Sequence, residues 1–173
     1  CKPKAGETVF VSAATGAVGQ VAGQLARLAG ARVVHIAGGE DKCAWAVREA
    51  GYDACFNHKT ERDVGAVLDK LCPQGIDADF ENVGGMHLEA ALNTIAFGAR
   101  IALCGMISVY NNAEPEPGPP NLAFLIARSA KMQGFIVSIY LHLAPQFAAE
   151  VAPLLAQGKI KFRESVYSGI AEA

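Results

Sequence analysis

The chain has 173 residues, of which 51% are hydrophobic, and its formal net charge at pH 7 is −2. This length predicts one well-buried domain and is too short for two typical ones. The charge provides no basic footprint for nucleic acid, and no polybasic run indicates an anionic membrane surface. We therefore expect a small-molecule partner, and neither nucleic acid nor a membrane.

Targeting segments and cysteine usage give a second set of expectations. No apolar run approaches the roughly 18 residues of a membrane span, and segment 1–7 lacks the apolar core of a signal peptide. We therefore predict a cytoplasmic protein. The five cysteines show no C-x-x-C spacing. This favours reduced thiols, at Cys55 and Cys104 in particular, over a disulfide framework or a zinc knuckle.

Strand and helix patterns alternate over the first hundred residues. Apolar or β-branched runs predict strands at 8–13, 32–37, 54–57 and 100–104, and a half-polar run predicts another at 76–81. Helical spacing of apolar residues predicts helices at 17–29, 42–50, 61–71 and 86–96. Such alternation requires a parallel sheet with right-handed crossovers.

The alternation is interrupted at 111–121, a loop that contains four prolines. An irregular loop of this length in a compact domain is usually functional or mobile. After it we predict a helix at 122–131, a strand at 133–140 and a helix at 145–157, and residues 159–173 form no further complete unit. Six strands with this spacing predict a doubly wound parallel α/β sheet of the Rossmann type, with strand order 3-2-1-4-5-6.

The stretch 9–19, VFVSAATGAVG, leads from an apolar run through two spaced glycines into a helical pattern. Gly16 suits a backbone conformation with positive φ beside a ligand, and Gly19 lets the helix pack closely on the strand. The first free N–H groups of the helix then point at a phosphate. Ala14 stands where the dinucleotide fingerprint usually has its first glycine. With a strand before it and a helix after it, the pattern predicts dinucleotide binding rather than a packing turn.

The end of the second predicted strand bears on which dinucleotide fits. A carboxylate there accepts hydrogen bonds from the ribose of NAD, whereas a 2′-phosphate requires a cation. The strand ends in Gly38-Gly39 and is followed by Glu40, Asp41 and Lys42. Our interpretation is that the two acids cap the next helix and that Lys42 meets the phosphate. Two alternatives stay open: an acid binds the ribose, or Lys42 is a solvated surface lysine.

Two polar residues at later strand ends are further candidates. Asn82 precedes Gly84-Gly85, so its amide either reaches the ligand or closes a local turn. Tyr110 begins the long loop, where a phenol either donates a hydrogen bond to a developing oxyanion or simply packs. His35 is predicted to be a core or edge histidine, and the histidines show no metal-ligand spacing. Neither a G-x-S-x-G elbow nor a phosphate loop of the triphosphatases is present.

Several of these segments together resemble the medium-chain dehydrogenase/reductase superfamily. The resemblance is to its zinc-independent prostaglandin and leukotriene reductase branch, which includes alkenal double-bond reductases. It rests on segments in the family's order and spacing: 13–19, 56–60, 81–85, 104–111 and 118–122. The motifs extend over nearly the whole chain and are together far more specific than the glycine turn.

The resemblance implies NADPH-dependent reduction of the carbon–carbon double bond of an α,β-unsaturated aldehyde or ketone. Tyr110 matches the tyrosine that gives a proton or hydrogen bond near the substrate, and is the expected catalytic residue. The residues that the resemblance assigns to NADP(H) are Thr15, Gly16, Ala17, Val18, Lys42, His58, Asn82, Cys104, Gly105, Met106, Ile107, Ser108, Val109, Tyr110, Phe135, Ile136 and Val137.

Two positions depart from the family pattern. His58 stands where relatives commonly have a tyrosine near the adenosine phosphate, and a partly protonated imidazole there still serves that phosphate. Gly39 replaces a frequent serine, which places more weight on Lys42.

The family's proteins also carry an N-terminal GroES-like domain and a C-terminal return segment. We therefore interpret residues 1–173 as the NADP-binding domain of a longer reductase. A homodimer, formed by pairing of the exposed sixth strand, is compatible with the resemblance. The alternatives are a quinone reductase of the same superfamily and a non-catalytic NADP(H)-binding sensor.

Overall fold

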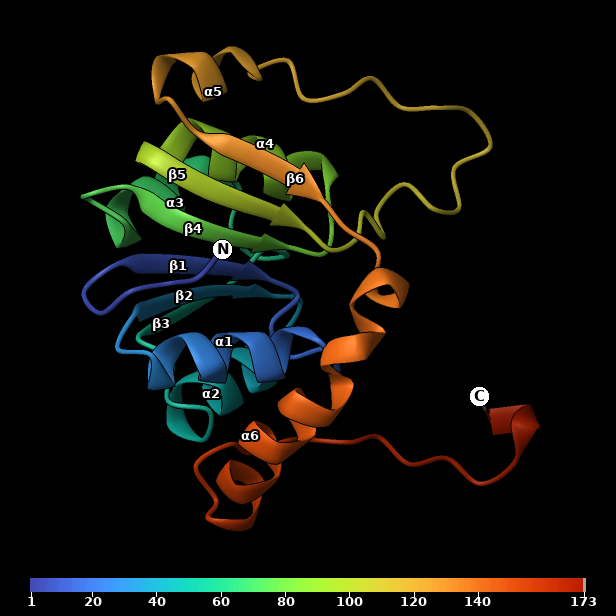
Figure 1. Cartoon of the computed structure of the whole chain (residues 1–173). Coiled ribbons are helices and arrows are strands. Elements are labelled where there is room, and N and C mark those ends of the chain that lie inside the picture. Colours follow the sequence, from blue (N-terminus) through green and yellow to red (C-terminus); the bar gives the residue numbers. More distant parts are fainter. Residues whose placement is uncertain (173) are drawn as a thin grey trace.

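The structure, a computed structural model, describes residues 1–172 and contains one six-stranded parallel sheet (Figure 1). Its order is β3-β2-β1-β4-β5-β6, as the sequence predicts. The strands are β1 (Thr8–Ser12), β2 (Arg32–Ala37), β3 (Ala54–Asn57), β4 (Ile76–Glu81), β5 (Ile95–Leu103) and β6 (Lys131–Gly134). The chain therefore crosses from one half of the sheet to the other between β3 and β4, and β1 and β4 lie side by side.

Helices cover both faces of this sheet. They are α1 (Gly19–Leu28), α2 (Glu40–Arg48), α3 (Val64–Leu71), α4 (Gly85–Thr94), α5 (Ala123–Ala127) and α6 (Ala144–Ala156), with short 3-10 turns η1 (Val137–Leu143) and η2 (Ile170–Glu172). Helices α1 and α2 pack on one face of the sheet, and α3 and α4 pack on the other (Figure 1). The core is accordingly divided: Val9 and Val11 pack toward α1 and α2, and Phe10 packs toward α3 and α4.

The first strand is central because its sequence tolerates burial on both faces. All five residues of β1 are buried, and it pairs in parallel with both β2 and β4. An uncharged, β-branched and aromatic run suits this position, since side chains alternate between two covered faces. The carboxyl end of β1 is thereby held at the middle of the sheet edge.

Several predicted boundaries differ from the structure. Helix α1 begins at Gly19 rather than at residue 17, and α3 begins at Val64 rather than at 61. In α3 the reason is a cap: the Asp63 carboxylate accepts the Ala66 N–H at 2.9 Å, which satisfies a donor of the first turn. Strand β5 begins at Ile95, inside the range 86–96 for which the helical spacing predicts a helix.

The predictions for the sixth strand and the helix before it were wrong in extent. Helix α5 covers only Ala123–Ala127, because Ser129 takes a positive φ of 50° and turns the chain toward β6. Strand β6 ends at Gly134, whereas the apolar pattern predicts a strand to residue 140. Gly134 is opposite Leu103, the last residue of β5, so the ladder has no further partner. Residues 137–143 form a 3-10 turn instead.

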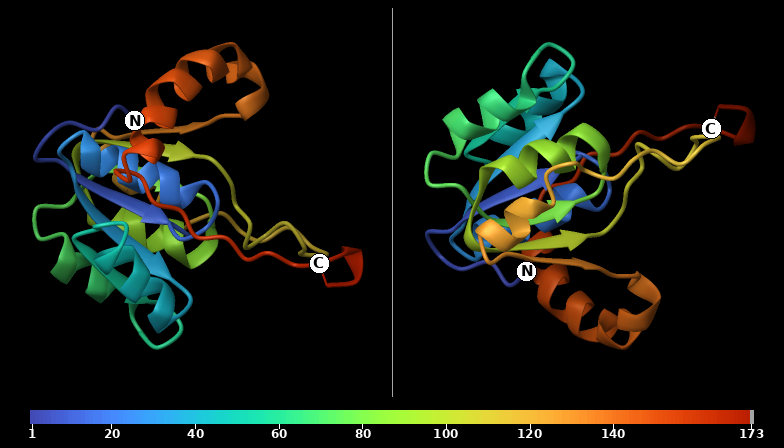
Figure 2. Two further views of the ribbon diagram at one scale, coloured as in Figure 1. Left: turned by 90° about the horizontal axis from the view of Figure 1, so that it is seen from below. Right: turned by 90° about the horizontal axis from the view of Figure 1, so that it is seen from above.

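The segment after α6 is held against α1 by buried glutamines, which the sequence pattern does not predict. The side chain of Gln24 donates to the Lys161 carbonyl at 2.7 Å and accepts the Lys161 N–H at 2.8 Å. Gln20 accepts the Arg163 N–H at 3.0 Å. Beyond this point the chain extends past the carboxyl ends of the strands, as does the proline loop (Figures 1 and 2).

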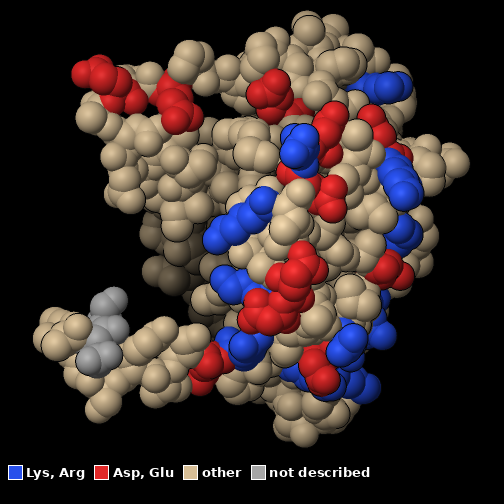
Figure 3. All heavy atoms as spheres, turned by 180° about the vertical axis from the view of Figure 1, so that it is seen from behind, with Lys and Arg blue, Asp and Glu red and all other residues tan. Residues whose placement is uncertain are grey.

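Charges of both signs share the surface behind the sheet. Lys and Arg side chains are interspersed with Asp and Glu on the face drawn in Figure 3. Among the described residues, no helix has both the length and the apolarity needed to cross a bilayer.

We expect Gly19→Ala to destabilise the chain. A Cβ at Gly19 would lie 2.5 Å from the Ala13 carbonyl oxygen and 2.5 Å from the Ala14 Cα, so α1 must move away from β1. Overpacking of this kind lowers the free energy of unfolding by about 1–3 kcal/mol. Urea denaturation measures it. Gly16→Ala is the matched control, because its Cβ would meet only the Ala13 oxygen at 3.1 Å; equal losses in both variants would contradict the packing role of Gly19.

Candidate functional site

The turn between β1 and α1 leaves backbone donors free at the sheet edge. Gly16, Ala17 and Val18 are exposed, and α1 begins only at Gly19. The Gly16 N–H bonds to the Ala13 carbonyl at 2.9 Å, whereas those of Ala17 and Val18 have no acceptor among residues 1–172. These two amides lie at the N-terminus of a ten-residue helix, where partial positive charge accumulates. The turn is therefore suited to an anionic group.

The conformation of this turn corrects one expectation about Gly16. The residue with positive φ is Ala13, at 50°, and Gly16 is outside the left-handed region. The absence of a side chain at Gly16 matters for space instead, because a Cβ there would lie 3.1 Å from the Ala13 oxygen. The predicted role of Gly19 in close helix–strand packing is confirmed by the contacts described above.

A pocket of about 260 Å³ opens beside the turn, at the carboxyl ends of the first four strands. It brings together three residues predicted from separate strand ends, Thr15, Lys42 and His58. The full lining is Ala13, Thr15, Gly16, Ile36, Ala37, Gly38, Lys42, His58, Val83 and His87. Lys42 is exposed and forms no ion pair with any described residue. An unneutralised ammonium group therefore lines a pocket that borders the turn with the free amides.

The two acids before Lys42 do not cap α2 with their side chains, as the sequence interpretation supposed. The cap position is Gly39, which makes no side-chain bond. Glu40 instead accepts the Asn57 side-chain N–H at 2.9 Å, and the Asp41 carboxylate lies 3.6 Å from the Arg163 guanidinium. Both still place negative charge in the first turn. Glu40 bonds the end of β3 and is therefore less free to bind a ribose.

A buried carboxylate that the sequence analysis did not single out joins the ends of β1 and β4. One oxygen of Glu81 accepts the Ser12 hydroxyl at 2.7 Å and the N–H groups of Val83 and Gly84 at 2.5 and 2.8 Å. The Ser12 oxygen in turn accepts the Asn82 N–H at 2.7 Å. Glu81 is the last of three acids that alternate along β4, and in the sequence only its position at the strand end signals this role. Burial raises the pKa of Glu81, and these hydrogen bonds oppose the rise.

Asn82 bonds protein rather than projecting wholly into solvent. Its side-chain N–H donates to the Ser12 carbonyl at 2.7 Å, across the junction of β4 and β1. The sequence left two alternatives for the Asn82 amide, a contact with the ligand or a local structural bond. The structure shows a structural bond, which joins two strands rather than closing a turn. The predicted contact of Asn82 with a ligand stays a prediction.

The loop after β5 is fastened to the end of β4. The N–H groups of Cys104 and Gly105 both donate to the Glu81 carbonyl, at 2.8 and 3.1 Å. Ser108 donates its N–H and its hydroxyl to the Val83 carbonyl, at 2.9 and 2.6 Å. Residues 104–108 thus follow the turn that Glu81 organises.

Tyr110 lies over this loop with its hydroxyl at the backbone. The phenolic oxygen accepts the Met106 N–H at 3.0 Å, while the side chain as a whole is 64% exposed. The accepting bond leaves the phenolic proton available to another acceptor. The hydroxyl is therefore held in place and still able to donate.

Residues Phe135, Ile136 and Val137 are not brought into the pocket that holds Lys42. They follow β6, where Ile136 and Val137 are exposed, and the Phe135 ring lies 6.2 Å from that of Phe80 and 6.1 Å from that of Tyr140. These rings line a separate hollow on the sheet face that carries Phe80. Their predicted contact with the cofactor stays a prediction.

The histidines include one residue of the pocket that sequence reasoning missed. His87 lines the pocket from the first turn of α4. No role for it was predicted from the sequence, because the histidines show no metal-ligand spacing. His35 is a core residue, as predicted: it is fully buried, and burial lowers its pKa to about 4. Among residues 1–172, no three His, Cys, Asp or Glu side chains gather as a metal site.

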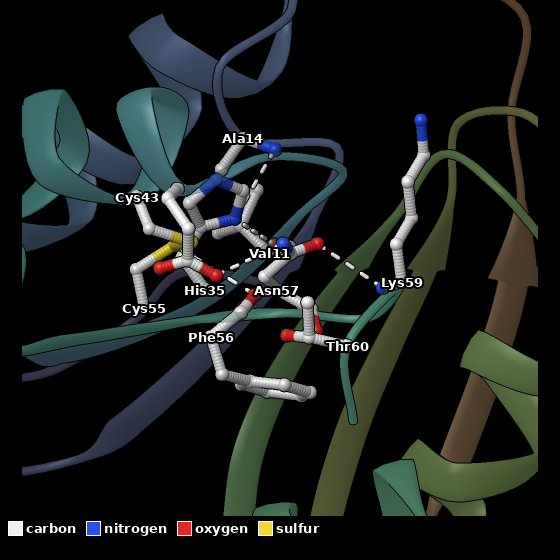
Figure 4. The surroundings of a disulfide bond; sticks show 10 residues. Val11, Ala14, His35, Cys43, Cys55, Phe56, Asn57, Lys59 and Thr60 are labelled. Carbon is white, nitrogen blue, oxygen red and sulfur yellow. Dashed lines mark hydrogen bonds between the residues drawn. A yellow bond between two sulfur atoms is a disulfide. The ribbon is translucent and has the colours of Figure 1, made fainter. Parts of the chain in front are cut away.

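Cys43 of α2 and Cys55 of β3 form a disulfide (Figure 4). This corrects the prediction of a reduced thiol at Cys55. The disulfide joins a helix to a strand, with a Cα–Cα distance of 5.1 Å. Because the two cysteines are 12 residues apart in the sequence, no short cysteine motif reveals the pairing. Cys104 is a free thiol, as predicted, and burial raises its pKa.

The sheet order, the crossing at β1 and β4 and the open turn define an α/β domain of the Rossmann nucleotide-binding class. Residues 17–156 match the family of zinc-binding dehydrogenases, and the chain belongs to that family. The agreement extends beyond the turn, since the match includes every element from α1 to α6.

Individual relatives are reductases. The chain is 44% identical to (+)-pulegone reductase of Mentha piperita and 46% identical to an NADP(+)-dependent 2-alkenal reductase of Nicotiana tabacum, in each case over all of this chain and 50% of the relative. The crystal structure of CurA from Vibrio vulnificus in complex with NADPH is 45% identical, with a TM-score of 0.91 over 98% of this chain and 52% of that one. The chain thus spans about half the length of these relatives.

We expect Asp79→Asn to stabilise the chain at neutral and alkaline pH. Asp79 is fully buried, and neither of its oxygens has a hydrogen-bond partner among the described residues. Burial, and then the charge of Glu81, raise its pKa well above the usual value. The folded state therefore holds this proton more tightly than the unfolded state. The stability that this gives is present below about pH 4 and is lost as the pH rises through the folded-state pKa.

The variant lacks the titrating group, so at about pH 8 its free energy of unfolding should exceed that of the parent by about 1–3 kcal/mol. This difference in the free energy of unfolding should become smaller toward about pH 4. Urea denaturation at the two pH values measures it. Asp77→Asn is the control on the same strand, because that carboxylate accepts the Thr8 N–H at 2.8 Å and its loss should only destabilise. A gap independent of pH would count against a charged Asp79 in the core.

Proposed function

We propose that this chain is the NADP(H)-binding domain of a longer, zinc-independent oxidoreductase that reduces the carbon–carbon double bond of α,β-unsaturated aldehydes and ketones. The observation that carries the proposal is the pocket in which the β1–α1 turn and Lys42 meet. The identity to alkenal and pulegone reductases supports the reaction class. The chain matches only half of the relatives' length, which supports a longer protein, and we propose that the rest contains a GroES-like domain and a C-terminal return segment. A cytoplasmic location and a homodimer stay predictions.

The pocket has the chemistry that a phosphorylated dinucleotide requires. The unpaired amides of Ala17 and Val18 suit the diphosphate, since helix N-termini bind such anions. The Lys42 ammonium suits a 2′-phosphate, which NADPH carries and NADH lacks. Gly38 adds a spatial argument: a Cβ there would lie 3.1 Å from the His58 ring nitrogen, so a side chain would fill the space.

When bound, NADPH supplies the hydride for the β-carbon of the substrate. In the proposal, the chain's own residues act on the oxygen at the other end of the conjugated system. The Tyr110 hydroxyl, held by the Met106 N–H, donates a hydrogen bond to the enolate oxygen as negative charge develops there. The loop 104–108, bonded to Glu81 and Val83, holds this hydroxyl near the carboxyl end of β4.

The test uses the polypeptide that contains this chain together with its substrate-binding part. It should oxidise NADPH when given an enal or enone, followed by the absorbance of NADPH. Turnover confined to quinones would favour the quinone reductase alternative. Tight NADPH binding with no turnover on enals, enones or quinones would favour a sensor. The 173-residue chain by itself should bind NADPH, although water reaches an incomplete cleft.

Lys42→Ala should weaken NADPH binding about tenfold to a hundredfold and NADH binding far less. It removes a charge-assisted contact to a phosphate that only NADPH has. Titration calorimetry of both cofactors on the chain measures this selectivity. Lys42→Arg should retain most of it, and Lys70→Ala, on the last turn of α3, is a charge-matched control that should change neither affinity. Equal losses for the two cofactors would remove Lys42 from the phosphate site.

Tyr110→Phe should lower kcat about a hundredfold, because the hydrogen bond strengthens as negative charge develops on the substrate oxygen in the transition state. The affinity for NADPH should change little. Steady-state kinetics with an enone, beside the NADPH titration, separates the two effects. Tyr167→Phe, in the exposed C-terminal segment, provides the comparison. An unchanged kcat in Tyr110→Phe would mean that the ring only packs over the loop.

A further inference from the structure

Two histidines from different strand ends face each other in the pocket. His58 follows β3, His87 lies in the first turn of α4, and their ring centroids are 5.0 Å apart in an edge-to-face arrangement. Both line the pocket together with Lys42 and Thr15. His87 is only 6% exposed, and its Nδ1 is buried without a hydrogen-bond partner among residues 1–172.

An unpartnered buried imidazole is costly unless another group bonds it, because its ring nitrogens lose their contacts with water. The neighbouring imidazole is the His58 ring, which lies edge-to-face with the His87 ring and forms no hydrogen bond with it. Both rings line the same pocket. Two imidazoles beside an ammonium form a set of donors whose charge increases when protons are available. Such a set matches a group with two negative charges.

We propose that His58 and His87 form, with Lys42, a proton-dependent site for the 2′-phosphate of NADPH, in which the imidazoles take up a proton as the phosphate binds. The inference rests on the proposed NADP(H) binding. It adds a residue, His87, that neither the sequence pattern nor the family resemblance assigns, and it makes selectivity for NADPH over NADH depend on pH.

The positive groups around the pair oppose protonation until an anion is present. Burial, and then the charge of His58, lower the pKa of His87 to about 4. Burial, and then the charge of Lys59, lower the pKa of His58. Lys42 enters the same pocket from α2, and His35 lies in the core below. Without a ligand, both imidazoles are therefore neutral near pH 7.

The carboxylates on the surrounding elements are bonded elsewhere, buried or exposed, and none of them is bonded to the pair. They are Glu40 and Asp41 on α2, Glu61 and Asp63 before α3, Asp69 on α3, and Asp79 and Glu81 on β4. Glu40 bonds the end of β3, Asp63 caps α3, and Glu81 bonds the β4 turn. Asp69 bonds Thr94 at the far end of α4. None of these residues accepts a hydrogen bond from either imidazole, so both rings are free to donate hydrogen bonds to a phosphate.

The sign of the pH dependence follows from linkage. A phosphate dianion favours the imidazolium, so binding raises the imidazole pKa and draws protons from solution. The affinity for NADPH then falls as the pH rises through the bound-state pKa. The 2′-phosphate itself titrates near pH ~6, and its protonation weakens binding below that value, which is the opposite sign. The imidazole effect is therefore measured above that range.

The experiment is titration calorimetry of the 173-residue chain with NADPH and with NADH between about pH 6.5 and about pH 8.5. Two buffers of different ionisation enthalpy give the number of protons taken up. The variants are His87→Phe, which keeps an aromatic ring in the buried position, and His58→Gln at the more open one. His142→Gln is the control, because this exposed histidine lies in η1, away from the pocket.

The parent chain should take up protons with NADPH but not with NADH, and its NADPH affinity should fall about threefold to tenfold for each pH unit. Either pocket variant should bind NADPH about tenfold more weakly near pH 6.5, with reduced proton uptake and little change toward NADH. If His87→Phe does not fold, as circular dichroism would show, His58→Gln tests the same prediction.

Equal losses for NADPH and NADH, with unchanged proton uptake, would overturn the inference, since they would mean that the rings only contact the adenine. The same holds if the parent chain binds NADPH with no proton uptake. Absence of any NADPH binding by the parent chain would overturn the proposed function as well, and so is distinguishable from failure of the histidine site alone.

Discussion

The hydrogen bond between Ser12 and Glu81 is the constraint on which the site depends. The two side chains come from β1 and β4, the strands between which the chain reverses direction across the sheet, and the bond is 2.7 Å long. The same carboxylate accepts two amides of the following turn, and its carbonyl accepts two amides of the loop after β5. One buried residue therefore fixes three strand ends relative to one another. The positions of Asn82 and Tyr110 follow from it.

This arrangement has a cost that is visible on the same face of the sheet. Asp79 and Glu81 are two residues apart on β4, so both side chains lie on the face of the sheet that α3 and α4 cover. Burial raises the pKa of both carboxyl groups. One oxygen of the Glu81 carboxyl group accepts three donors, whereas neither oxygen of the Asp79 carboxyl group has a hydrogen-bond partner among the described residues. Polar groups at a functional edge thus differ in kind: one is an organiser of backbone turns, and the other is a local source of instability. Stability and site geometry are therefore separable by substitution at neighbouring positions.

Sequence reasoning predicted the sheet order and the position of the turn because these follow from local rules. An uncharged run such as 8–12 must be central, and glycines at 16 and 19 permit a close turn. It did not predict interactions between distant segments. Glu81 meets Ser12 across 69 residues, and Cys43 meets Cys55 through packing of α2 on β3. The end of β6 was also missed, because it depends on where its partner β5 stops.

The candidate site is divided between a part that this chain builds and a part that it only borders. The groups proposed for the adenosine end, Lys42, His58 and His87, converge in one pocket from α2, β3 and α4. On the other side, Tyr110 is largely exposed, and so are the apolar residues 136–137. Cofactor selectivity is thus a property to be measured on the chain itself, whereas turnover depends on whatever completes the exposed side.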